Sequence, residues 1–266
     1  MRTDIELWQA AASLVLVAIV VALSIWRGLG LERSILWATF RATAQLLGVG
    51  ALFTIIFESS IARWWSTLWV LVMVVIAGWV VTRRAAPVPG LNWLGVSAIA
   101  ATVTVVLAVV FGLQVLDADP VTVVVIAGIT IGNTMPSVVQ AVDRTLSALA
   151  EQAPRIEAML ALGFAGREAT KQVGRDVARL ALLPQIERTK VVGLIALPGA
   201  MTGLLLAGVD PVDAVLIQLV VMFLVLGSVA LAVTVVTLAL LGAALTADLR
   251  LADWVQAAAR LPADRG

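Results

Sequence analysis

Long apolar segments alternate with short polar ones along most of this chain. A helix needs about 20 consecutive, mostly apolar residues to cross a bilayer, and seven segments come close to that length. None of the seven has an Asp, Glu, Lys or Arg near its centre. They predict an all-α membrane protein with seven transmembrane helices, at Leu7–Trp26, Ser34–Phe57, Trp64–Thr82, Asn92–Leu113, Val121–Ala141, Thr189–Ala207 and Val212–Leu245. The last segment is longer than one upright helix needs, so we expect it to tilt or to project beyond the bilayer.

The connections between these segments differ in their content of basic residues. Because basic loops tend to stay in the cytoplasm, we predict that the N-terminus lies outside and the C-terminus lies in the cytoplasm. Arginine and lysine concentrate in connections 27–33, 83–91 and 142–188, and the C-terminal tail adds Arg250, Arg260 and Arg265. The other connections, 58–63, 114–120 and 208–211, hold one arginine between them.

Composition indicates one integral membrane domain over residues 1–266. Hydrophobic residues make up 61% of the chain and charged residues 13%, whereas soluble domains average about 45–50% apolar and about 25% charged. Cysteine and histidine are both absent, which excludes disulfides, thiolate metal sites and histidine ligands. No cleavable signal peptide stands out. We expect the lipid bilayer, and no nucleic acid, among the partners of this chain.

The one long polar segment, about 143–188, is predicted to form two cytoplasmic helices. Residues 155–162 favour a first helix, which Gly163 punctuates. A second helix is expected over residues 167–182, and Pro184 is expected to stop it, because proline lacks the N–H that continues a helix.

Apolar and basic residues occupy different faces of that second helix. Val173, Val177 and Leu180 form an apolar stripe. Like charges one helical turn apart destabilise an isolated helix by a few tenths of a kcal/mol per pair. The basic residues recur at every fourth position, as Arg167, Lys171, Arg175 and Arg179. Two interpretations of these residues stay open: they face water and lipid headgroups, or they bind a partner protein.

A motif at the start of this segment resembles the EAA loop of ABC-transporter permeases. It runs from Glu157 and Ala158 to Gly163, and in those permeases the loop is a short helix that docks on the ATPase subunit. Met159 replaces the second alanine of the pattern, and the Leu-Pro pair that normally closes it comes late, at residues 183–184. The resemblance implies that Glu157, Ala158, Gly163, Arg167 and Lys171 contact an ATPase.

Three further motifs resemble the FetB-type iron-export permeases and their plant aluminium-tolerance relatives: Arg41–Leu46, Gly128–Met135 and Leu197–Gly203. The resemblance implies a permease subunit in a bacterial inner membrane, working as a pair of copies with separate ATPase subunits. The chain has no phosphate-binding loop of the form G-x-x-x-x-G-K-[ST]. We therefore expect no enzyme activity and no bound cofactor in this chain, with ATP and Mg held by the partner.

Polar residues and prolines within the predicted spans indicate a translocation pathway. Proline frees the helical carbonyl four residues before it, and helices broken in this way often line transport routes. We expect breaks at Pro136 and Pro198. The candidate pathway residues are Gln45, Asn133, Thr134, Met135, Pro136, Pro198, Met201, Thr202 and Gln218. The alternative is structural: amides and small residues also hold membrane helices together, and Met135 and Met201 suit packing better than ligation.

The spans offer carbonyls, amides, hydroxyls and methionine sulfur, which do not bind a bare transition ion tightly. We therefore expect no resident metal site, and either weak coordination of an ion in transit or transport of a complexed or non-metal substrate. The function that fits is an ABC permease exporting iron, another metal or a metal complex. The alternative is an ATP-independent secondary transporter or channel, which needs intramembrane ionisable groups to couple protons.

Overall fold

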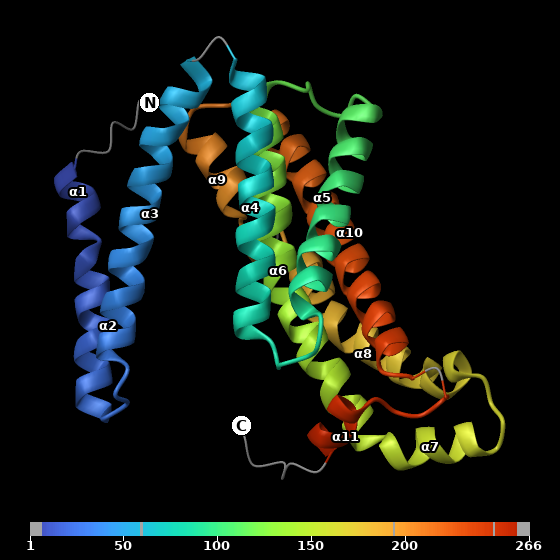
Figure 1. The fold of residues 1–266 in the computed structure, drawn as a ribbon. Coiled ribbons are helices and arrows are strands. Elements are labelled where there is room, and N and C mark those ends of the chain that lie inside the picture. Colours follow the sequence, from blue (N-terminus) through green and yellow to red (C-terminus); the bar gives the residue numbers. More distant parts are fainter. Residues whose placement is uncertain (1–6, 59–60, 194, 247, 260–266) are drawn as a thin grey trace.

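The computed structural model describes residues 7–58, 61–193, 195–246 and 248–259, and every regular element in these ranges is a helix (Figure 1). The all-α class is therefore confirmed. The predictions that concern Arg260 and Arg265 lie outside the described residues. The helices are α1 (Leu7–Ala12), α2 (Leu14–Arg27), α3 (Glu32–Glu58), α4 (Ala62–Arg84), α5 (Leu91–Gly112), α6 (Pro120–Glu151), α7 (Ala153–Ala161), α8 (Gly166–Val191), α9 (Gly199–Leu206), α10 (Pro211–Ala243) and α11 (Asp253–Ala259).

Five of the described helices, α3, α4, α5, α6 and α10, are long and apolar enough to cross a membrane. They correspond to the second, third, fourth, fifth and seventh predicted spans. The longest, α10, has 33 residues and so is about 50 Å long, which exceeds the roughly 30 Å hydrocarbon core of a bilayer. The first predicted span is divided at Ser13 into α1 and the 14-residue α2.

The prediction of one continuous span over Thr189–Ala207 is wrong. Helix α8 ends at Val191, and the chain turns before α9 begins at Gly199. Two residues explain the break. Gly193 has φ +88°, a left-handed conformation that suits glycine, and Pro198 has extended ψ at the N-cap of α9. The eight residues of α9 are too few to span a bilayer.

Two prolines expected to interrupt helices lie inside them instead. Pro184 is within α8 and Pro136 is within α6, so the predicted stop and the predicted break are both wrong. A proline inside a helix removes one hydrogen bond and crowds one carbonyl. Neighbouring helices compensate for that cost here, because α8 packs along both α6 and α10.

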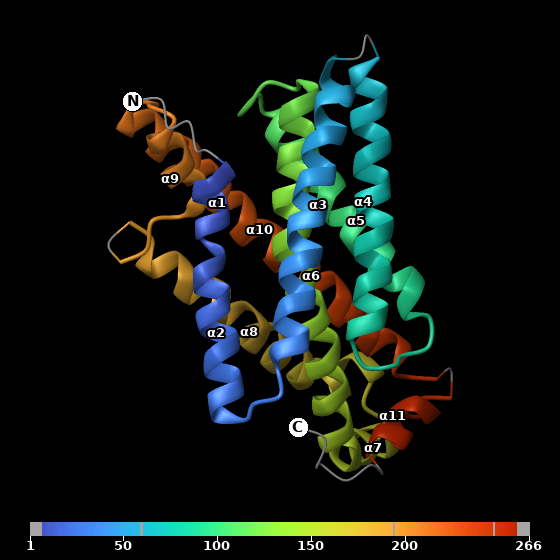
Figure 2. The ribbon, with the colours of Figure 1, turned by 90° about the vertical axis from the view of Figure 1, so that its left-hand side faces the viewer.

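Helices α4, α5, α6, α8 and α10 form one bundle, and α6 and α10 lie at its centre (Figures 1 and 2). Close approach of α4 to α5 depends on Gly78, where a Cβ atom would lie 2.8 Å from the Cα atom of Val96. A second apolar cluster joins the ends of α6 and α10 to α7, α8 and α11 through Leu149, Ile156 and Val173. The cytoplasmic segment expected from sequence is therefore packed onto the bundle.

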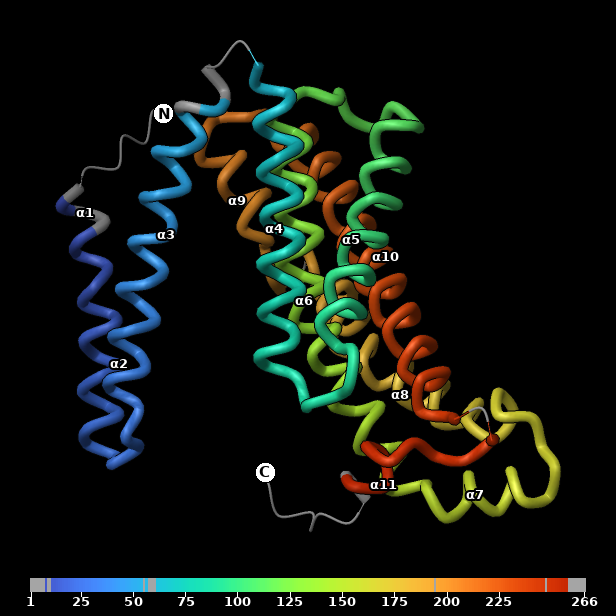
Figure 3. Tube along the Cα trace, in the orientation of Figure 1, coloured from blue at the N-terminus to red at the C-terminus, as the bar shows by residue number. Residues whose placement is uncertain are grey.

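Helices α1, α2 and α3 form a hairpin that stands apart from the bundle (Figures 1 and 3). No residue in the most apolar stretch of α3 is buried. The hairpin meets α4 near one end of α3, where the rings of Phe53 and Trp69 are 6.4 Å apart in an edge-to-face arrangement.

Candidate functional site

A polar cavity of about 250 Å³ lies between α6, α8 and α10 and the segment that leads into α9. Three of the predicted pathway residues, Asn133, Pro198 and Gln218, line it together. Apolar residues, including Ile129, Val221 and Val225, form the rest of its wall. The cavity thus brings together residues from three distant parts of the sequence.

Helix α8 contributes three polar residues to this cavity that sequence analysis did not select: Gln185, Arg188 and Thr189. The predictions had placed Gln185 and Arg188 in the cytoplasmic segment, after the expected helix stop at Pro184, and Thr189 at the start of the sixth span. Because α8 continues through Pro184, it instead rises beside α10 toward α9 (Figure 2). The missed signal was the run of helix-forming residues after Pro184.

The cavity lies along the middle stretches of helices that are long and apolar enough to cross a membrane. Asn133 is thirteen residues into α6 and Gln218 is seven residues into α10, which is about 20 Å and about 10 Å from the start of each helix. Both helices start at the same end of the bundle (Figure 1). Arg188, which lies outside every predicted span, also lines this cavity.

Hydrogen bonding leaves several polar groups of the cavity available to a ligand. Asn133 Nδ2 donates to the carbonyl of Ile129 at 2.8 Å, and Thr189 Oγ1 donates to the carbonyl of Gln185 at 2.9 Å. Gln218 is only 7% exposed, and its Oε1 atom has no hydrogen-bond partner. A buried acceptor without a donor costs about 1–3 kcal/mol, so a ligand that donates to it is favoured.

Among the described residues that line the cavity, Arg188 alone carries a formal charge. Within the described residues, no carboxylate lies within 4 Å of its guanidinium. The neighbouring carboxylate, Glu187, is paired with Lys190 at 2.7 Å. The cavity is therefore electropositive.

The remaining predicted pathway residues do not line this cavity. Thr134 is fully buried in α6 and donates to the carbonyl of Thr130. Met135 packs against the apolar core and Pro136 is exposed. Thr202 donates to the carbonyl of Pro198 at 3.1 Å within α9, which also holds Met201. Gln45 is exposed on α3, away from the bundle.

At the opposite end of α8, helix α7 presents the motif that resembles an EAA loop. Ile156 is buried, whereas Glu157 and Ala158 are exposed. Gly163 has φ +87° and ends α7 in a Schellman motif, with its N–H on the carbonyl of Leu160 and the N–H of Phe164 on the carbonyl of Met159.

Two large apolar side chains beside this motif are exposed and were missed by sequence analysis. Leu162 is 78% exposed and Phe164 is 44% exposed. Together with Glu157 and Ala158 they form a surface, which we call the α7 face. Exposed apolar residues rimmed by polar ones are typical of protein-binding surfaces.

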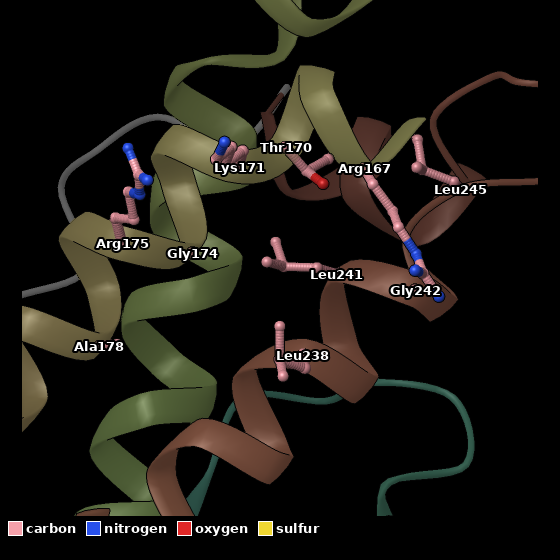
Figure 4. A pocket seen from close by; sticks show the side chains of 10 residues that line it. All are labelled: Arg167, Thr170, Lys171, Gly174, Arg175, Ala178, Leu238, Leu241, Gly242 and Leu245. Carbon is pink, nitrogen blue, oxygen red and sulfur yellow. The ribbon is translucent and has the colours of Figure 1, made fainter. Parts of the chain in front are cut away.

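The basic residues of α8 are exposed, as their spacing predicted. Arg167, Lys171 and Arg175 border a groove of about 620 Å³ against Leu238, Leu241 and Leu245 of the α10 end (Figure 4). The buried stripe of α8 differs from the prediction. It runs at four-residue spacing through Ala169, Val173, Val177 and Ala181, so Leu180 falls outside it and is 47% exposed.

Metal-binding clusters are absent from the described residues, in which no three Asp or Glu side chains gather. The polar side chains around the cavity are three amides, one hydroxyl and one guanidinium, from Gln185, Asn133, Gln218, Thr189 and Arg188. This set suits hydrogen bonding to a ligand better than tight chelation of a bare transition ion.

Comparison with known proteins places these features in a family. Residues 7–244 match the family described as "Uncharacterised protein family (UPF0014)". The chain is 36% identical to "UPF0014 membrane protein STAR2" of Oryza sativa subsp. japonica, over 83% of this chain and 77% of that protein. It is 33% identical to "Probable iron export permease protein FetB" of Escherichia coli (strain K12), over 83% and 85%. It is 32% identical to "Protein ALUMINUM SENSITIVE 3" of Arabidopsis thaliana, over 83% and 80%. No solved structure matches the chain.

Proposed function

Because the chain belongs to the UPF0014 family of membrane permeases, we propose that it is the permease subunit of an ABC transporter. A separate ATPase, holding ATP and Mg, binds the α7 face and drives export of iron, another metal or a metal complex. The membrane is a bacterial inner membrane, with the α7 face in the cytoplasm. The FetB relative, whose printed name describes iron export, supports the cargo.

One observation carries this proposal: α8 is a single helix that connects the α7 face to the polar cavity. It begins at Gly166, next to the end of α7, and Arg188 lies 22 residues later, which is about 33 Å along the helix. Val173 and Val177 pack with Ile156 of α7 in one apolar cluster. A displacement of α7 by the ATPase is therefore transmitted along α8 to the cavity.

A second copy of the chain completes the pathway in this proposal. The cavity is partly open, and Arg188, Glu187 and Lys190 are exposed beside it at membrane depth. Charged residues inside a membrane face other protein or water. Gln45 of α3 is also exposed, and amides of this kind join membrane helices. The two copies therefore pack through these polar surfaces.

The Glu187 carboxylate also supports the second candidate, a secondary transporter without an ATPase. Proton-coupled transporters use ionisable groups at membrane depth, and α8 brings Glu187 to that depth. The pairing of Glu187 with Lys190 at 2.7 Å favours a structural role for both. For this reason the ABC permease remains the function that we propose.

The test is to purify the chain from its native host and identify bound proteins, then to reconstitute the complex and measure ATP hydrolysis. We expect an ATPase to co-purify. Glu157→Lys and Gly163→Pro should abolish stimulation of ATP hydrolysis by the permease, because both alter the α7 face. Asp117→Lys, an equal charge change in an exposed connection at the other end of the bundle, should leave it intact. Full stimulation in both α7 variants would refute the coupling role.

A further inference from the structure

We infer that the polar cavity binds a hydroxylated carboxylate, free or as the ligand of a metal ion. This inference rests on the proposed transport function, because it names the cargo class of the same cavity. Its carboxylate binds Arg188, and one of its hydroxyl groups donates to Gln218 Oε1. Two separate observations lead to this class: the charge of the cavity and its unsatisfied acceptor.

The charge of the cavity selects an anion. Arg188 lines the cavity, and no carboxylate within the described residues lies within 4 Å of it. A guanidinium has five donors in a planar fork that matches the two oxygens of a carboxylate. At membrane depth such a cation has a strong need for a counter-charge. A bare metal cation would instead be repelled by Arg188 and would find no carboxylate in the cavity wall.

The unsatisfied acceptor selects a hydroxyl donor. Gln218 lines the same cavity, is 7% exposed and leaves Oε1 without a hydrogen-bond donor. A carboxylate has no proton to give to it at neutral pH, so an unsubstituted carboxylate would leave this atom unsatisfied. A ligand that bears hydroxyl groups in addition to its carboxylate satisfies both Gln218 and Arg188.

The size and shape of the cavity agree with a small ligand of this class. Its volume of about 250 Å³ corresponds to roughly eight water molecules at about 30 Å³ each. The wall combines polar groups on α6 and α8 with the apolar Val221 and Val225 of α10. Hydroxycarboxylates are also oxygen ligands for hard metal ions, so this class is compatible with export of a metal complex.

The test is equilibrium binding of three probes to the full chain in phosphatidylcholine nanodiscs. The probes are gluconate, sorbitol, which has the hydroxyl groups without the charge, and hexanoate, which has the charge without the hydroxyl groups. Gluconate should bind at least about tenfold more tightly than sorbitol, because a charge-assisted hydrogen bond is lost. Gluconate should also bind about fivefold more tightly than hexanoate, because the neutral bond to Gln218 is lost.

Substitutions assign each preference to its residue. Arg188→Gln should reduce gluconate affinity to that of sorbitol while leaving sorbitol affinity unchanged. Gln218→Met, which removes the unsatisfied acceptor, should equalise gluconate and hexanoate. Arg179→Gln is the matched control, because Arg179 is an exposed arginine of α8 that does not line the cavity. If Arg188→Gln does not insert, Gln185→Glu should weaken gluconate binding by placing a competing carboxylate beside Arg188.

The inference is overturned if gluconate binds no more tightly than sorbitol, or if its affinity is the same in the wild type and in Arg188→Gln. Tighter binding of bare ferrous ion than of gluconate would also overturn it. The result is separable from that of the proposed function. A chain that co-purifies with an ATPase but fails to bind gluconate refutes the cargo class alone. A chain that binds gluconate but co-purifies with no ATPase refutes the ABC assignment alone.

Discussion

The central bundle and the α1–α3 hairpin are both apolar, yet they bury very different fractions of their residues. In the most apolar stretch of α4, 33% of the residues are buried, and in that of α3 none is. Lipid is as apolar as leucine, so apolar surface alone gives membrane helices little reason to associate. Hydrophobicity therefore places both regions in the bilayer without deciding which helices pack together.

Glycines at the contact between α4 and α5 account for part of the difference. In the bundle, Gly78 and Gly95 let α4 and α5 approach closely, with Val81 and Val96 against them. In α3, the position of Gly48 is open, and a Cβ atom there would meet nothing within 4 Å. At Gly48, therefore, no neighbouring helix packs against the glycine.

The largest effect that we expect comes from filling these two kinds of glycine. Gly78→Val should lower the free energy of unfolding by about 1–3 kcal/mol, because overpacking forces α4 away from the α5 backbone. Gly48→Val is the matched control on α3 and should leave the stability of the isolated chain unchanged. Thermal unfolding in nanodiscs measures both. Equal losses in the two variants would show that α3 is packed as tightly as α4.

A smaller effect is expected inside the hairpin itself. Ser24 is buried, its Oγ donates to Glu32 Oε1 at 2.8 Å and accepts from the N–H of Leu31 at 3.2 Å. Ser24→Ala should destabilise the α2–α3 connection by about 1–2 kcal/mol, since hydrogen bonds to charged groups contribute more than neutral ones. Hydrogen exchange should become faster in α2 and α3 and stay unchanged in α4.

The control for this variant is Ser97→Ala. The Ser97 hydroxyl donates within α5 to the carbonyl of Leu94, so its loss removes no contact between helices. Faster exchange throughout the chain in Ser24→Ala would contradict the view that the hairpin and the bundle are separate units.

The aromatic contact between Phe53 and Trp69, which joins the two regions, should have a modest energy. Phe53 of α3 and Trp69 of α4 form an edge-to-face pair, and such pairs contribute about 0.5–1.5 kcal/mol beyond their burial. A double-mutant cycle with Phe53→Leu and Trp69→Leu should give a coupling energy in the lower half of that range. The same cycle with Trp79→Leu in place of Trp69→Leu should give none, because Trp79 packs with Arg83 instead. Coupling in both cycles would indicate contact along the whole of α3.

The same contrast explains how much could be predicted from sequence. Five spans were recognisable, because an uninterrupted apolar run of span length has few alternatives. The sixth predicted span, Thr189–Ala207, was wrong, because Gly193 and Pro198 divide an apolar run that appears continuous from composition alone. Pro184 misled in the other direction: proline usually ends a helix, but packing against α6 and α10 lets α8 continue.

The candidate site was predictable only in part for the same reason. Asn133, Pro198 and Gln218 stand out as polar or helix-breaking residues in apolar surroundings, and the structure brings them together. Arg188 does not stand out, because it lies in the polar segment 143–188, beyond the proline at which a helix end was expected. Gln45 has the expected chemistry but lies on α3. Which polar residues meet depends on contacts between distant helices, and no local pattern encodes those contacts.

The smallest effect concerns how two helices begin, α6 in the bundle and α2 in the hairpin. In the bundle, Asp119 caps α6 by accepting from the N–H groups of Val121 and Thr122 at 2.9 and 3.0 Å. In the hairpin, the Ser13 side chain makes no capping hydrogen bond at the start of α2. A hydrogen bond from the Thr122 hydroxyl, followed by that from its backbone N–H, holds the pKa of Asp119 below its ordinary value.

A lowered pKa in the folded state means that the Asp119 cap stabilises the protein above the unfolded pKa of about 3.9. That stabilisation is lost as the pH falls through the folded pKa.

Thr122→Val removes the main cause of the shift, so the pKa of Asp119 should rise and the cap should weaken at a higher pH than in the wild type. Asp119→Asn keeps a capping side chain that does not titrate, so it isolates the contribution of Asp119 from those of other carboxylates. Unfolding temperatures of the three proteins from pH 6 down to pH 3 measure the effect, which solvent screening keeps small because Asp119 is exposed. The same pH dependence in the wild type and in Thr122→Val would show that the threonine hydroxyl does not set the pKa of Asp119.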